Sequence, residues 1–61
     1  MKKPKGMVSQ GRDIIFLRGS RETVWRTVYW DGERFWCVWY GELIELRRSK
    51  LGMGFATVDK Y

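Results

Sequence analysis

Short apolar runs separated by turn-forming residues dominate this chain and predict a series of strands. The segment DIIFLR, residues 13–18, contains four consecutive apolar residues, as in a short strand that is covered on both faces. The segments TVWRTVYW and RFWCVWY, residues 23–30 and 34–40, are rich in β-branched and aromatic residues. Because they flank Asp31-Gly32, a dipeptide that favours a type I′ turn, we predict a β-hairpin here.

The hairpin register follows if Asp31 and Gly32 are the two central turn residues. One face then carries the cross-strand pairs Trp30 with Glu33, Val28 with Phe35, Arg26 with Cys37, and Val24 with Trp39. The other face carries Thr23, Trp25, Thr27, Tyr29, Arg34, Trp36, Val38 and Tyr40. A three-residue turn with a bulge would change these partners. In either register one face lines the core, and the second face needs a cover of its own.

Two segments follow the hairpin. Residues 42–51, ELIELRRSKL, contain good helix formers, but a strand from Leu43 to Arg48 places Ile44 and Leu46 on one side, and we favour the strand. Gly41-Glu42 suits a type II′ turn before it. Residues 55–58, FATV, predict a last short strand.

This series of elements predicts a mainly β fold, a small antiparallel five-stranded meander or SH3-like barrel. The alternative is a three-stranded antiparallel sheet with one helix at residues 42–51. Residues 1–11 have little to bury and predict a flexible basic N-terminal arm, which leaves residues 12–61 as a single small domain.

The chain has 61 residues, and a domain of this size buries only about 60% of the surface that its unfolded chain exposes. Cys37 is the only cysteine and histidine is absent, so neither an internal disulfide nor a histidine-based metal site can reinforce the fold. Most of the ten aromatic rings must therefore be buried, with room for two or three exposed ones.

The net charge of +5 is concentrated at the two ends. Residues 1–12 contain four basic residues and no acid, and residues 47–61 contain four basic residues and one acid. Residues 13–46 contain four arginines and six acids. If the two ends lie together, their charges form one patch that would attract a polyanion.

The composition argues against several functional classes. Without histidine or a conspicuous carboxylate pair, we expect no enzyme, no metal site and no cofactor. Cys37, in the middle of a strand, is expected to be a small buried apolar residue. No apolar segment is long enough to span a membrane, and a single unpaired cysteine suits a reducing compartment, so we expect a cytosolic protein.

The first functional hypothesis is a DNA- or RNA-binding accessory or regulatory domain, in which basic residues contact phosphate and rings on the hairpin stack on bases. The expected binding residues are Lys2, Lys3, Lys5, Arg12, Arg34, Arg47, Arg48, Lys50, Trp25, Trp36 and Tyr40. The alternative hypothesis is a protein-interaction module that uses the exposed rings for self-association or for a partner protein. An aromatic face alone does not separate the two, because the same rings can belong to the core.

Overall fold

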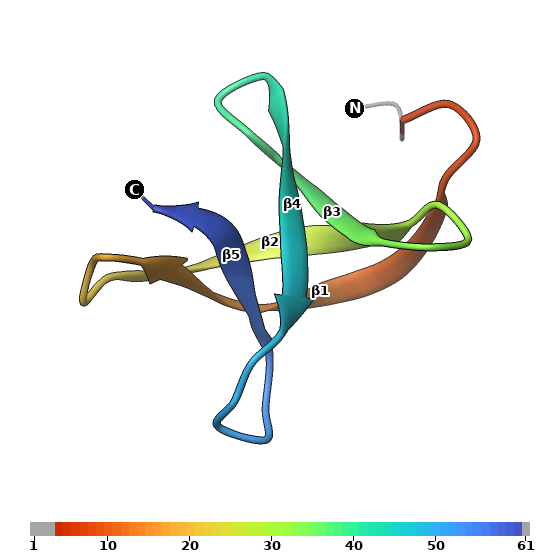
Figure 1. Cartoon of the computed structure of the whole chain (residues 1–61). Coiled ribbons are helices and arrows are strands. Elements are labelled where there is room, and N and C mark those ends of the chain that lie inside the picture. The colour runs from red at the N-terminus through yellow and green to blue at the C-terminus, as the bar shows by residue number, and fades with distance from the viewer. Residues whose placement is uncertain (1–3, 61) are drawn as a thin grey trace.

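A computed structural model describes residues 4–60, which form five strands closed into a small barrel (Figure 1). The strands are β1 (Val8–Arg18), β2 (Thr23–Trp30), β3 (Phe35–Trp39), β4 (Glu42–Arg48) and β5 (Phe55–Lys60). Consecutive strands pair antiparallel, whereas the closing pair, β1 with β5, is parallel. An up-and-down series of five strands must close in this way, because its first and last strands run in the same direction.

The segment that could have been a helix is strand β4. Ile44 and Leu46 are buried, while Glu45 between them is only half-buried, as the two-residue period of a strand requires. β4 pairs with β3 along its first part and with β5 along its last part. The mainly β, five-stranded barrel is therefore confirmed, and the alternative fold with a helix at residues 42–51 is wrong.

The central hairpin forms, but its register differs by two residues from the expected one. Trp30 lies opposite Phe35, not Glu33, and Tyr29 lies opposite Trp36. The connection is thus a four-residue loop, residues 31–34, closed by a hydrogen bond from the Asp31 amide to the Arg34 carbonyl. Because a shift of two residues preserves the strand faces, the face assignments survive for the residues of β2 and β3, whereas Glu33, Arg34 and Tyr40 lie in turns.

The type I′ geometry occurs at the next turn instead. Tyr40 and Gly41 have φ values of 49° and 78°, and the flanking residues Trp39 and Glu42 are paired. The expected type II′ turn at Gly41-Glu42 is therefore wrong by one residue. Tyr40 is the only non-glycine residue with positive φ in the described part of the chain.

The first strand begins at Val8, earlier than expected. Val8 pairs with Trp30 and Ser9 with Tyr29, and the register is irregular between Ser9 and Arg12. Residues 8–11 therefore belong to the barrel and not to an arm. These residues are exposed and mostly polar, so no alternation of apolar residues in the sequence marks them as a strand. Lys2 and Lys3 lie outside the described residues.

The barrel interior is a single apolar cluster with contributions from all five strands. Its buried members are Ile15, Val28, Cys37, Ile44, Leu46 and Phe55, with Val24, Phe35 and Trp39 packed against them. Seven of the nine described aromatic residues are buried or half-buried, as the small size of the domain requires. The two exposed rings are Trp25 and Tyr40.

Candidate nucleic-acid interface

Basic residues from β1, β4 and the β4–β5 loop gather around a groove on the outer surface of β1, β5 and β4. Ala56 on β5 pairs with Phe16 on one side and with Arg47 on the other, so a small side chain lies between two large ones. The groove has a volume of about 380 Å³. We call it the Arg47 groove, and its main lining residues are Phe16, Arg18, Arg47, Arg48, Lys50 and Leu51.

The Arg47 groove is lined by four cationic side chains and by none of the acidic residues in the described chain. Arg18 is anchored, because its Nη1 donates a hydrogen bond of 2.7 Å to the Val58 carbonyl. The Arg48 guanidinium carbon lies 5.1 Å from the centre of the Phe55 ring and 5.4 Å from that of Phe35. These cation–π contacts place Arg48 against two rings of the core cluster while its charge remains exposed.

A second basic surface lies where β2 separates from β3. We call it the Trp25 opening, lined by Arg12, Trp25, Arg26, Thr27, Tyr29 and Val38, with a volume of about 220 Å³. Trp25 is 53% exposed, whereas Tyr29 is buried. Both guanidinium groups bind the same acceptor, because Arg26 Nη1 and Arg12 Nη2 lie 2.7 and 3.2 Å from the Trp25 carbonyl oxygen.

Arg26 shows how the corrected register explains a residue that the sequence left unexplained. Its guanidinium carbon lies 4.9 Å from the centre of the Trp39 ring. If the observed register were continued beyond its two pairs, Arg26 would fall opposite Trp39, whereas the expected register placed it opposite Cys37. In a hairpin sequence, an arginine at the position that pairs with a tryptophan on the next strand would indicate such a cation–π contact.

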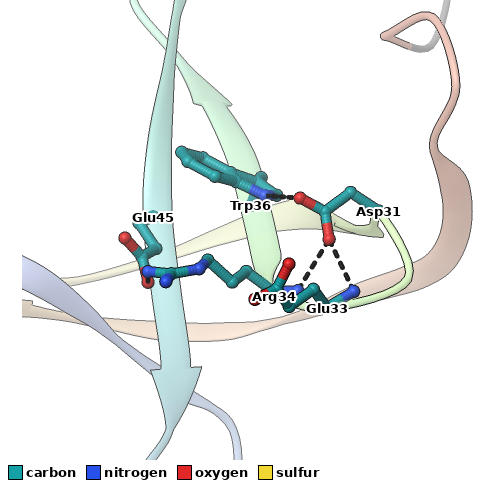
Figure 2. A network of polar contacts seen from close by, with 5 residues as sticks. All are labelled: Asp31, Glu33, Arg34, Trp36 and Glu45. Carbon is teal, nitrogen blue, oxygen red and sulfur yellow. Dashed lines mark hydrogen bonds and ion pairs between the residues drawn. The ribbon is translucent and has the colours of Figure 1, made fainter.

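Two of the expected binding residues are instead engaged inside the hairpin (Figure 2). The Asp31 carboxylate accepts hydrogen bonds from the Glu33 and Arg34 amides, both at 2.7 Å, and from Trp36 Nε1 at 2.9 Å. The bond from the Arg34 amide, followed by that from Trp36, lowers the pKa of Asp31 from 3.8. Arg34 Nη1 lies 3.1 Å from Glu45 Oε2, so part of its charge is compensated.

The remaining expected residues are spread over the molecule. Tyr40 is 86% exposed at the β3–β4 turn, with its ring edge-on to Trp39 at 4.7 Å. Lys5 is exposed in the turn before β1. In Figure 1 the described segment before β1 lies at the right and the β4–β5 loop at the bottom, and Lys5 does not line the Arg47 groove.

The structure thus groups the expected residues into two sets. Arg47, Arg48 and Lys50 come together in the Arg47 groove, and Arg12 and Trp25 meet at the Trp25 opening. Sequence reasoning did not assign Arg18 to the first set or Arg26 to the second. Both are strand residues whose neighbours depend on the barrel register. The distribution of charge along the sequence therefore does not indicate which residues they lie beside.

The chemistry of the remaining polar groups is limited. Cys37 is buried, and desolvation raises the pKa of its thiol to about 11, which suppresses the nucleophilic thiolate. Among residues 4–60, no three His, Cys, Asp or Glu side chains are grouped so that they could hold a metal ion.

Residues 4–60 include no helix with the length and apolar character needed to cross a membrane.

Comparisons with protein-family models, with curated proteins and with solved structures found no match to this chain.

Proposed function

We propose that this protein binds nucleic acid and that the Arg47 groove holds its phosphate backbone. The observation that carries the proposal is the convergence of Arg18, Arg47, Arg48 and Lys50 on one groove whose lining includes no carboxylate. These four residues come from β1, β4 and the β4–β5 loop. Arg47 and Arg48 also face a neighbouring pocket that contains Glu33 and Glu45, so the excess positive charge lies on the groove side. A polyphosphate backbone would supply several anions to this side at once.

The groove also suits phosphate in detail. Arg18 and Arg48 are held in place by a carbonyl and by two aromatic rings, so less side-chain entropy is lost on binding. Arg47 and Lys50 are exposed and adjust to the path of the strand. Lys2, Lys3, Lys5 and Arg12, from the N-terminal part of the chain, are expected to add contacts that depend little on base sequence.

The proposal is for a binding role in a cytosolic protein and not for catalysis. The sequence contains no histidine, and the single thiol is buried with a raised pKa. DNA and RNA both present the phosphates that the groove would contact, so both belong to the proposed class of ligand.

Salt dependence tests the phosphate contacts directly. Fluorescence anisotropy with a labelled DNA duplex, from about 50 to about 200 mM salt, should give a linear fall of log K with log salt. Each phosphate contact contributes about −0.9 to that slope on duplex DNA, so Arg47→Gln should reduce its magnitude by about 0.9. The measurement compares the slopes of the two proteins and not only their affinities.

Arg21→Gln is the matched control, because it removes one exposed arginine of the β1–β2 loop that does not line the groove. It should leave the slope within error of the unmodified protein. Equal slopes for the two variants would place the phosphate contacts elsewhere, and no binding at about 50 mM salt would overturn the proposal.

A second candidate function, protein interaction, is favoured by two apolar side chains in the β4–β5 loop. Leu51 is 72% exposed and Met53 is 57% exposed, beside the same groove. If this loop mediates self-association, sedimentation should show a mass that rises with concentration, and the double variant Leu51→Ser, Met53→Ser should be monomeric. A monomer at all concentrations would exclude self-association.

A further inference from the structure

The β2–β3 ladder is much shorter than the strands that form it. It contains only two pairs, Tyr29 with Trp36 and Trp30 with Phe35. On its other edge, β2 remains paired with β1 as far as Thr23. In a continued β2–β3 register, Thr27 would oppose Val38, but the strands separate before this point. The Trp25 opening lies at this separation, because both Thr27 and Val38 line it.

The main chain at the opening is available for hydrogen bonds. Asp31 and Arg34 close the loop through a main-chain hydrogen bond, so by strand alternation the polar groups of Tyr29, Thr27 and Trp25 point toward β3. The Trp25 carbonyl accepts from the guanidinium groups of Arg12 and Arg26 in place of a β3 amide. The ladder does not pair Thr27 with Val38, so the main-chain groups that these residues turn toward each other lie outside its regular hydrogen bonding.

The side chains around this polar edge provide a stacking surface and positive charge. Trp25 exposes about half of its surface at the rim, at 53%. The Arg26 guanidinium stacks on Trp39, and the Arg12 guanidinium donates a hydrogen bond to the Trp25 carbonyl. The lining includes none of the acidic residues in the described chain.

We propose that the Trp25 opening binds one unstacked base of a single-stranded nucleic acid. The base stacks on the Trp25 ring, its edge hydrogen-bonds to the main chain of Thr27 and Val38, and Arg12 and Arg26 contact the flanking phosphates. A base in a duplex cannot enter, because its faces are stacked and its pairing edge is occupied. This inference rests on the proposed nucleic-acid binding and adds the form of nucleic acid and the position of the base.

The experiment compares three labelled probes of about 12 nucleotides, a length within the site sizes of small single-strand-binding domains. They are oligothymidine, an abasic strand with the same number of phosphates, and a duplex. Binding is measured by anisotropy at one low salt concentration. We expect oligothymidine to bind about 5- to 150-fold more tightly than the abasic strand, the range set by stacking of one base.

Variants locate the effect. Trp25→Ala should remove most of the difference between oligothymidine and the abasic strand while leaving abasic binding unchanged, and Trp25→Phe should retain much of it. Leu43→Ala is the matched control, since Leu43 is an exposed apolar residue, at 45%, that does not line the opening. Circular dichroism confirms that each variant is folded.

A measurement on the unmodified protein covers the case in which Trp25→Ala does not fold. Amide signals of Thr27 and Val38 in a two-dimensional NMR spectrum should shift and exchange more slowly with oligothymidine, and not with the abasic strand. Equal affinity for both strands, or unchanged Thr27 and Val38 signals, would overturn the base site while nucleic-acid binding stands. If none of the probes binds, both proposals fail, and a protein ligand for this surface becomes the explanation to pursue.

Discussion

At the scale of single residues, Gly54 has no room for a side chain. Its φ is +68°, and a Cβ atom would lie 2.5 Å from Ile14 Cγ2 and 2.6 Å from the Ile14 carbonyl oxygen. Gly52, in the same loop, has a similar φ of +80° but nothing within 4 Å of its Cβ position. The two glycines therefore separate the cost of the left-handed backbone from the cost of a steric clash.

We expect Gly52→Ala to lower the free energy of unfolding by about 1–2 kcal/mol, the cost of a left-handed L-residue. Gly54→Ala should lower it by about 2–5 kcal/mol, because a clash with main-chain atoms of β1 is added to the same strain. Urea unfolding followed by tryptophan fluorescence measures both. Equal losses for the two variants would show that β1 and the β4–β5 loop move apart to make room.

Tyr40 occupies a position that neither its backbone conformation nor burial of its ring would favour. It holds a positive φ of 49° and exposes 86% of its surface, in a turn where asparagine would fit the backbone better. Residues held in sparsely populated backbone conformations cluster at functional sites. The Tyr40 ring contacts the Trp39 ring, and Trp39 contacts Arg26, which lines the Trp25 opening.

At the scale of elements, the central hairpin was predictable and its loop was not. Alternation of β-branched and aromatic residues identified both strands and both faces, since the side-chain period of a strand is local. The loop type depended on whether the Asp31 carboxylate reaches the amides of Glu33 and Arg34 and the Trp36 indole. Asp-Gly permits a type I′ turn, but three hydrogen bonds to one carboxylate stabilise the wider loop.

These hydrogen bonds make the stability of the hairpin loop depend on pH, and the direction of the dependence follows from the pKa of Asp31. The pKa of Asp31 is lower in the folded protein than its ordinary value of 3.8, so the ionised form stabilises the fold. That contribution is complete above about pH 3.8 and is lost as the pH falls through the lowered pKa. The stability of the hairpin should therefore decrease only under acidic conditions.

The variant Asp31→Asn has a side chain that cannot ionise, so it lacks the stabilisation that the ionised Asp31 carboxylate gives to the fold. Its melting temperature should lie below that of the unmodified protein at about pH 7, and the gap should narrow toward about pH 3. Glu42→Gln is the control for loss of one exposed carboxylate. Thermal unfolding across this range measures the gap, and a gap that stays constant with pH would mean that Asp31 acts without its charge.

At the scale of the whole molecule, a buried threonine helps to close the barrel. Thr57 is 1% exposed, its Oγ1 accepts a hydrogen bond of 2.9 Å from the Arg18 amide, and it donates one of 2.8 Å to the Asp59 carbonyl. The register between β1 and β5 shifts between Phe16 and Arg18, where the regular ladder is interrupted. The hydroxyl satisfies groups that this interruption would leave without partners.

Thr57→Val keeps the shape of the side chain but removes both hydrogen bonds. We expect it to lower the free energy of unfolding by about 1–3 kcal/mol, because it leaves polar groups of the β1–β5 pair without partners. Thr23→Val, at an exposed position on β2, should change it by less than about 0.5 kcal/mol. Chemical denaturation compares the two, and equal effects would show that the barrel closes without help from this hydroxyl.

The sequence by itself determined the two hairpin strands, their alternating faces and the need to bury most of the rings, because these follow from local periodicity and from chain length. It favoured a strand after the hairpin without excluding a helix. Only the tertiary structure decided the hairpin register, the start of β1 at Val8 and the parallel closure of β1 on β5. It also decided that Arg18 joins Arg47 and that Arg26 lies on Trp39. These pairings join residues that are distant in the chain or lie beyond a loop, and register between strands depends on packing that no local pattern encodes.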